Sequence, residues 1–212
     1  MANLANMLNP HPTIDMVQLI KGTDALNVRQ NNWGTLNFHT GQTYYTDDRY
    51  SANILTVNNP LQKVIGTTGL SSCTGIVILT QTRAIVGHYS DGFIVGPNAD
   101  VSFIHYLVQN ADYLRDNARA WIMHCRNEPN ADARSTTGGG GLGGQLYAIL
   151  RDRVRMPLGN ITVLKYEQPP EPVLVPGVKD PWGDLGEGSI IVDGRNSPAQ
   201  MATVYAQGYK QL

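Results

Sequence analysis

The stretch TTGLSSCTGIVILTQTRAIVGHY, residues 67–89, decides the fold of this chain, because it holds two apolar runs separated by a short polar turn. The first run is Thr74–Leu79 and the second is Ala84–Tyr89, and both are rich in β-branched residues. Such runs predict two strands joined as a β-hairpin. The polar turn contains neither Gly nor Asn, so it indicates no particular turn type.

The predicted hairpin brings a thiol and an imidazole together. Cys73 directly precedes the first strand, and His88 lies near the end of the second. We predict that Cys73 lies opposite His88, with the chain reversing through a two-residue loop at Thr80–Gln81 or a four-residue loop at Leu79–Thr82. Opposed residues share a face of the hairpin. A neighbouring imidazole favours the thiolate, which is the nucleophilic form of cysteine.

A buried cysteine is more commonly a small core residue than a nucleophile, and this alternative applies to Cys73. Two features favour the nucleophile. His88 is in register across the hairpin, and the segment that leads to Cys73 is rich in Gly and Ser. Backbone N–H groups around Ser71 and Ser72 can therefore approach a reacting carbonyl and stabilise an oxyanion.

The pattern TTGLSSC at residues 67–73, followed by Gly87-His88, resembles the signature of the cysteine-dependent protein glutamine deamidases. This superfamily includes the chemoreceptor glutamine deamidases of bacterial chemotaxis, the catalytic domain of the cytotoxic necrotizing factors and the Burkholderia lethal factor. The similarity covers about Gly66–Asp91, with a looser agreement in element order up to about Glu167. Family members often have Gly at one of the two positions that precede the cysteine, where this chain has Ser71 and Ser72.

The resemblance implies that Cys73 is the nucleophile, His88 the base and Thr67 the residue that orients the imidazole. It implies hydrolysis of a glutamine side-chain amide in a partner protein to glutamate, through a Cys thioester and without a cofactor or a metal. It also implies a β-sandwich flanked by helices. Three alternatives stay open: a transglutaminase or a cysteine peptidase that uses the same Cys–His pair, or a non-catalytic binding module that has kept the fold.

Two other residues are candidates for a supporting role. Asp91 can orient the imidazole, as carboxylates often do, although Asp91-Gly92 is equally typical of a turn. His124 is a candidate for the second layer around the site. On a strand, His124 and Cys125 point to opposite faces and cannot pair with each other, so Cys125 is expected in the core.

The order of the remaining patterns predicts a layered α/β domain with a mixed sheet, formed by the whole chain, residues 1–212. Together with the fold that the resemblance implies, we expect a mixed β-sheet sandwich flanked by helices. Further strands are expected at 36–39, 43–46, 52–57, 62–67, 118–125, 161–166 and 189–194. Helices are expected at 13–22, 100–114, 145–155 and 197–205. Between them we expect a flexible arm at 1–12, a Gly-rich loop at 135–144 and an extended Pro-rich surface segment at 168–186.

The Gly-rich run contains the pattern GxGxxG twice within residues 138–144, which mimics a dinucleotide-binding turn. Such a turn follows a strand directly, whereas about a dozen residues separate Gly138 from the strand that is expected to end at Cys125. We therefore interpret the run as a linker or as a lid beside the active site. The pair Asp47-Asp48 is followed by no further ligand at chelating spacing, so no metal is expected.

Composition excludes several classes of partner. The net charge is −1, which gives no electrostatic basis for binding nucleic acid or an anionic membrane. No apolar run approaches the roughly 20 residues of a membrane helix. We expect a monomer whose partner is a protein substrate with an exposed glutamine.

The start of the chain lacks the basic and apolar regions of a secretory signal. The two cysteines, Cys73 and Cys125, are expected to be thiols, since a disulfide would silence the nucleophile. We therefore expect a cytoplasmic protein, or a toxin-like effector that enters a target cell without a classical signal peptide.

Overall fold

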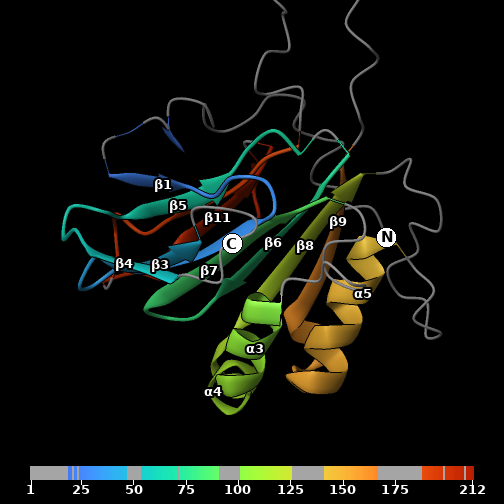
Figure 1. The fold of residues 1–212 in the computed structure, drawn as a ribbon. Helices are drawn as coiled ribbons and strands as arrows, with labels where there is room; N and C mark the ends of the chain where they lie inside the picture. The colour runs from blue at the N-terminus through green and yellow to red at the C-terminus, as the bar shows by residue number, and fades with distance from the viewer. Residues whose placement is uncertain are drawn as a thin grey trace, which may run out of the picture.

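The structure is a computed structural model that describes residues 19–20, 22, 24–46, 54–70, 72–90, 101–125, 141–166, 188–197, 199–207 and 209–212. In these residues two β-sheets pack against each other, and helices cover the outer face of the larger sheet (Figure 1). This arrangement confirms the predicted α/β class with a sheet sandwich and flanking helices.

The larger sheet has the strand order β4-β3-β2-β7-β6-β8-β9. Its neighbours are antiparallel except for β8 and β9, which run parallel, so the sheet is mixed. The strands are β2 (Asn32–Asn37), β3 (Gln42–Thr46), β4 (Ile54–Asn58), β6 (Thr74–Leu79), β7 (Arg83–Tyr89), β8 (Arg119–Cys125) and β9 (Ile161–Tyr166).

The smaller sheet has the order β1-β5-β10-β11-β12. Its first pair, β1 and β5, is parallel, and the other pairs are antiparallel. The strands are β1 (Ala25–Asn27), β5 (Val64–Thr67), β10 (Ile190–Asp193), β11 (Thr203–Ala206) and β12 (Tyr209–Lys210).

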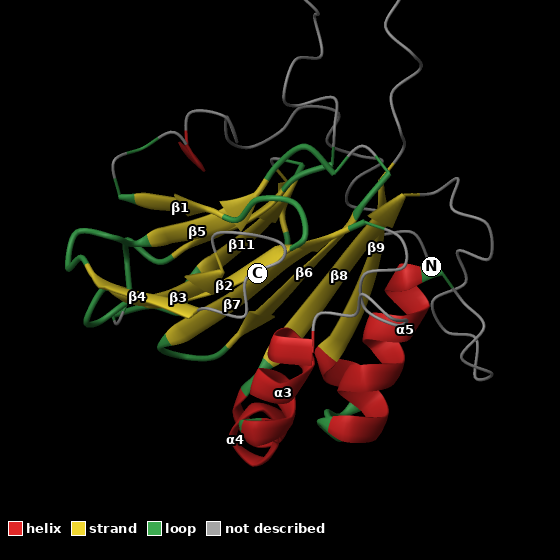
Figure 2. Ribbon diagram, in the orientation of Figure 1, coloured by secondary structure: helices red, strands yellow, loops and turns green. Residues whose placement is uncertain are grey.

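The helices lie together on the side of the larger sheet that faces away from the smaller one (Figure 2). They are α3 (Val101–Gln109), α4 (Ala111–Asn117) and α5 (Leu142–Ala148), and α5 continues through a π-helical turn at Ile149–Arg153. A short 3₁₀ turn, Leu158–Asn160, leads into β9. The larger sheet is therefore covered on both faces in its central part.

This double coverage explains why β6 is a continuous apolar run rather than an alternating one. Successive residues of a strand point to opposite faces. Val77 and Leu79 therefore belong to the core between the two sheets, whereas Ile76 and Ile78 belong to the core beneath the helices.

The predicted hairpin is present as β6 and β7, but its register differs from the prediction. His88 lies opposite Gly75 instead of Cys73, and Thr80 and Arg83 close the turn through a backbone hydrogen bond of 2.8 Å. The chain reverses at Gln81 and Thr82, so the pairing is shifted by two residues. A shift of two preserves the face of every side chain. Cys73 therefore remains on the same face as His88, as a diagonal neighbour.

The predicted helix at 197–205 is wrong. The described part of this segment contains a turn at Ser197 and then strand β11, which pairs with β10. Val204 and Ala206 alternate with partly buried residues along β11, which is the period of a strand and not of a helix. Pairing with β10 thus outweighs the local preference for a helix that the sequence of this segment indicates.

The end of the predicted Gly-rich loop is also wrong, because Leu142, Gly143 and Gly144 form the first turn of α5. A Cβ atom at Gly143 would lie 3.1 Å from Cδ2 of His124 on β8. Glycine at this position therefore allows the helix to approach the sheet closely, and this packing outweighs the low helix propensity of glycine.

The other strands and helices that fall on described residues are confirmed in type, with shifted ends. The helix predicted at 100–114 forms two helices, α3 and α4, separated at Asn110. The expected arm at 1–12, most of the helix at 13–22, residues 135–140 and the Pro-rich segment at 168–186 lie outside the described residues. No helix within the described ranges is long and apolar enough to cross a membrane.

Gly66 gives a test of how closely the strands of the smaller sheet must pair. It lies opposite Ile191, and a Cβ atom there would lie 2.5 Å from Ile191 Cγ1 and 2.8 Å from the Ile190 carbonyl oxygen. We expect Gly66→Ala to lower the free energy of unfolding by about 1–3 kcal/mol, as overpacking does. The measurement is equilibrium unfolding in urea.

Gly159→Ala is the matched control, since no atom lies within 4 Å of a Cβ placed there. We expect it to change the stability by less than about 0.5 kcal/mol. Equal stabilities for the two variants would contradict the close approach of β5 to β10.

Candidate active site

Three predicted site residues lie at the junction of the two sheets. Thr67 is the last residue of β5 in the smaller sheet, His88 lies on β7 in the larger sheet, and Cys73 directly precedes β6. Oγ1 of Thr67 lies 2.7 Å from Nδ1 of His88, and Cys73 belongs to the core between the sheets. The fold therefore pairs Thr67 with His88, and it places Cys73 on the same face of the larger sheet as His88.

Leu70 packs over the end of the hairpin where Gly75 pairs with His88. Gly75, opposite His88, has no side chain, and a Cβ atom there would lie 2.9 Å from Cδ1 of Leu70. Leu70 is fully buried in the core between the sheets, and its N–H donates to the Gly188 carbonyl at 3.0 Å. This packing and this bond hold Leu70 against the smaller sheet.

The hydrogen bonds of Thr67 define the tautomer of His88. A threonine hydroxyl has one proton, and the Thr67 hydroxyl donates it to the Val28 carbonyl at 2.8 Å. The same oxygen must then accept from Nδ1–H of His88. We assign the imidazole proton to Nδ1 from this network. Nε2 consequently carries a lone pair, and it has no hydrogen-bond partner among the described residues.

His88 is electrically neutral at physiological pH. Its side chain is 3% exposed, and burial lowers its pKa from 6.5 to about 4, although the Val28 carbonyl acts in the opposite direction. Removal from water disfavours the charged imidazolium. The site thus holds a neutral imidazole whose unprotonated nitrogen is Nε2, as a general base requires.

Gln30, which the sequence did not single out, contacts the thiol directly. Its side-chain Nε2 donates to Sγ of Cys73 at 3.4 Å. Cys73 is only 4% exposed, but Gln30 and Ser72 are both exposed. The thiol is therefore buried but in contact with an exposed side chain.

The turn between β1 and β2 holds Gln30 in place. Asn31 donates its backbone N–H to the His88 carbonyl at 2.6 Å, and its side-chain oxygen accepts from both N–H and hydroxyl of Ser90. Asn32 donates its side-chain amide to the Gln30 carbonyl at 3.0 Å. Asn31 has a φ of 59°, a conformation that asparagine tolerates better than most residues.

The oxyanion donors expected near Ser71 and Ser72 are only partly described. Ser71 lies outside the described residues, and Ser72 lies in an exposed turn. The N–H of Cys73 itself donates to the Leu70 carbonyl at 2.8 Å. In this conformation the Cys73 amide is therefore not available to a substrate oxygen.

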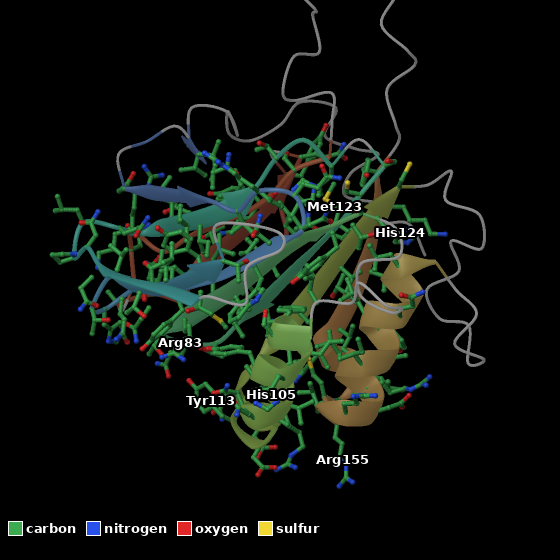
Figure 3. The ribbon with its side chains drawn as sticks, in the orientation of Figure 1. Arg83, His105, Tyr113, Met123, His124 and Arg155 are labelled. Carbon is green, nitrogen blue, oxygen red and sulfur yellow. The ribbon has the colours of Figure 1, made fainter. Side chains whose placement is uncertain are left out.

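The two supporting candidates differ in outcome. Asp91 lies outside the described residues. His124 is fully buried, and it lies against Gly143 of α5. Met123 and His124 point to opposite faces of the larger sheet (Figure 3), and Met123 belongs to the core that contains Cys73. His124 thus faces the helices, and the structure does not bring it to the thiol.

Cys125 lies in the same core as Cys73, and both residues are thiols rather than a disulfide. Tyr166, beside Cys125 in the sheet, donates its hydroxyl to the Cys73 carbonyl at 2.7 Å. This bond ties the backbone of the candidate nucleophile to β9. No group of three His, Cys, Asp or Glu side chains that could hold a metal occurs within the described ranges.

The turn Val28–Asn32 is the part of the site that sequence reasoning missed. The only signal was its Asn-rich composition, which indicates a loop but no contact with residues 39 positions or more away. Comparison of the chain with protein-family models finds no match, and comparison with curated proteins finds none. The class of the site is therefore inferred from its geometry together with the sequence resemblance.

The buried His88 gives a prediction about stability and pH. The unfolded chain binds a proton at this residue below a pH of about 6.5, whereas the folded protein binds it only near pH 4. The contribution of His88 to the free energy of unfolding is therefore complete above pH 6.5 and is lost as the pH falls toward 4. We expect this residue to account for about 3 kcal/mol of the acid destabilisation.

Urea unfolding of the wild type and His88→Gln at several pH values between 4 and 7.5 measures this contribution. The variant should lose about 3 kcal/mol less than the wild type over this interval. His39→Gln, at an exposed turn, is the control and should follow the wild-type profile. Parallel profiles for wild type and His88→Gln would show that His88 is not held neutral by burial.

Proposed function

We propose that this protein is a cysteine-dependent hydrolase that converts glutamine side chains of a partner protein to glutamate. The observation that carries the proposal is the bond between Thr67 and His88, which leaves Nε2 of the imidazole unprotonated on the face that Cys73 shares. A Cys–His pair with a third residue that orients the base is the arrangement used by cysteine nucleophiles.

The lowered pKa of His88 favours a Cys–His pair that is uncharged at rest. At rest the pair is a neutral thiol and a neutral imidazole rather than a thiolate–imidazolium ion pair. His88 then takes the thiol proton as Sγ attacks the carboxamide carbon. The S–C bond forms, and the carbonyl electrons move to the oxygen to give a tetrahedral oxyanion.

Collapse of the oxyanion breaks the C–N bond. The imidazolium of His88 gives its proton to the departing nitrogen, which leaves as ammonia, and the acyl group remains on Sγ as a thioester. The neutral imidazole then activates water, which hydrolyses the thioester and restores the thiol. The balance needs only water, and the partner retains a glutamate where it had a glutamine.

The position of the site supports a macromolecular substrate that presents a protruding side chain. The thiol lies beneath the surface next to Gln30 and Ser72. A glutamine is long enough to reach such a site from an exposed loop of a partner. In this proposal the chain acts as a monomeric, toxin-like effector on a protein of a target cell.

Cys73→Ala and His88→Ala test the chemistry. Extracts of bacterial and of eukaryotic cells are incubated with wild type and each variant, and peptides are searched by mass spectrometry for glutamine converted to glutamate, with ammonia measured in parallel. We expect conversion with wild type and a loss of at least about 100-fold with either variant. Activity near wild type in either variant would contradict the proposal.

The same experiment separates the alternatives. Covalent incorporation of an added primary amine at the glutamine indicates a transglutaminase, and new peptide termini indicate a peptidase. Absence of any altered peptide in both extracts, together with a Cys73 that iodoacetamide does not label near neutral pH, indicates a binding module.

Thr67 gives a finer prediction, because it positions the base without contacting the substrate. Thr67→Val keeps the shape and removes the hydroxyl that accepts from Nδ1. We expect turnover to fall by about 10- to 100-fold, with a shifted pH–rate profile. In this variant only the backbone carbonyl of Val28 remains to orient the imidazole of His88. Thr67→Ser restores a hydroxyl and should recover most of the activity. A Thr67→Ser variant as slow as Thr67→Val would indicate a packing role instead.

A further inference from the structure

We infer that Gln30 is a catalytic residue whose side-chain amide supplies the hydrogen bond that the developing negative charge requires, first at Sγ of Cys73 and then at the substrate oxyanion. This inference rests on the proposed function, since it assigns a role within the same reaction. Its starting point is the contact of 3.4 Å between Gln30 Nε2 and Cys73 Sγ.

Two groups next to the thiol do not stabilise a negative charge on it in the resting protein. Its own N–H is already bonded to the Leu70 carbonyl, so it cannot serve as an oxyanion donor in this conformation. His88 is neutral at rest, because burial lowers its pKa to about 4, so the imidazole contributes no positive charge to the thiolate before proton transfer. The Gln30 amide is a neutral donor that needs no titration to be present.

The geometry also fits the change of charge during the reaction. As the S–C bond forms, negative charge passes from sulfur to the carbonyl oxygen, only two bonds away. A carboxamide has two N–H donors, so a side chain that contacts Sγ can follow the charge to the oxygen by a small rotation. Removal of one hydrogen-bond donor to an oxyanion commonly lowers turnover by about 10²–10³-fold.

The backbone of Gln30 is fixed by bonds to the other site residues. Val28, two residues earlier, accepts from Thr67, and Asn31, one residue later, donates to the His88 carbonyl. The turn therefore links the orienting residue, the base and the amide donor in one hydrogen-bonded unit. The side chain of Gln30 is exposed, so its replacement removes the donor without opening a cavity in the core.

The test is the rate at which iodoacetamide alkylates Cys73, measured from pH 5 to 10 by mass spectrometry of the labelled peptide. The variant is Gln30→Glu, which keeps the shape, removes the donor and places a negative charge beside the sulfur. We expect its apparent thiol pKa to rise, with alkylation at pH 7 reduced by about tenfold or more. Gln30→Leu, which only removes the donor, should shift in the same direction by less.

Gln81→Glu is the matched control. Gln81 is an exposed glutamine at the β6–β7 turn, at the opposite end of the hairpin from His88, so this variant has the same change in net charge. It should retain the wild-type alkylation profile. Thermal unfolding of each variant checks that the fold is retained, and if Gln30→Glu unfolds, Gln30→Leu supplies the decisive profile.

The outcomes separate the two proposals. If Cys73 is alkylated in a His88-dependent manner and its profile is unchanged in both Gln30 variants, the role of Gln30 is overturned and the proposed function stands. If Cys73 is inert in the wild type and in His88→Ala, the proposed function fails and the role of Gln30 fails with it. A shift in the Gln30 variants that is absent in Gln81→Glu supports the inference, since a purely structural role would not move the thiol pKa.

Discussion

The hydrogen bond between Thr67 and His88 is the interaction on which the rest of the site depends. It joins the last residue of β5 in one sheet to β7 in the other, at 2.7 Å, and it is anchored by the bond from Thr67 to the Val28 carbonyl. One buried hydroxyl thereby connects both sheets and fixes which imidazole nitrogen carries the proton. Buried polar groups must be paired, so the packing of the two sheets and the state of the base are determined together.

Burial of His88 has a cost and a chemical consequence. Removing an imidazole from water disfavours its charged form, and at His88 the carbonyl of Val28 compensates only in part. In the proposed reaction, a base with so low a pKa takes the thiol proton as the sulfur attacks the substrate. Under that proposal, donors that stabilise the negative charge lower the barrier, and the side-chain amide of Gln30 is a donor that contacts the sulfur.

Much of the fold followed from the sequence, because periodicity and β-branched content report burial. The strands β6, β8, β9 and β10 lie where apolar runs predicted them. The errors occurred where tertiary packing outweighs local signals. The glycines at the start of α5 were predicted to form a loop. Gly143 is needed there because it packs against the ring of His124, which lies on a strand distant in sequence. Residues 197–205 were predicted to form a helix, because the sequence alone does not show that β11 pairs with β10.

The site itself shows which kind of sequence information is robust. The predicted pairing of Cys73 with His88 was wrong by two residues, yet both side chains remain on one face, since the face depends on parity and not on the pairing itself. Thr67 could be placed only through a resemblance, because nothing local connects β5 to β7. Gln30 could not be placed at all, because its contact spans 43 residues and depends on the turn that Asn31 fixes against His88. Candidate residues on or next to the hairpin strands can therefore be predicted from the sequence pattern. A residue such as Gln30, which a distant turn places against the same side chains, can be identified only from the tertiary structure.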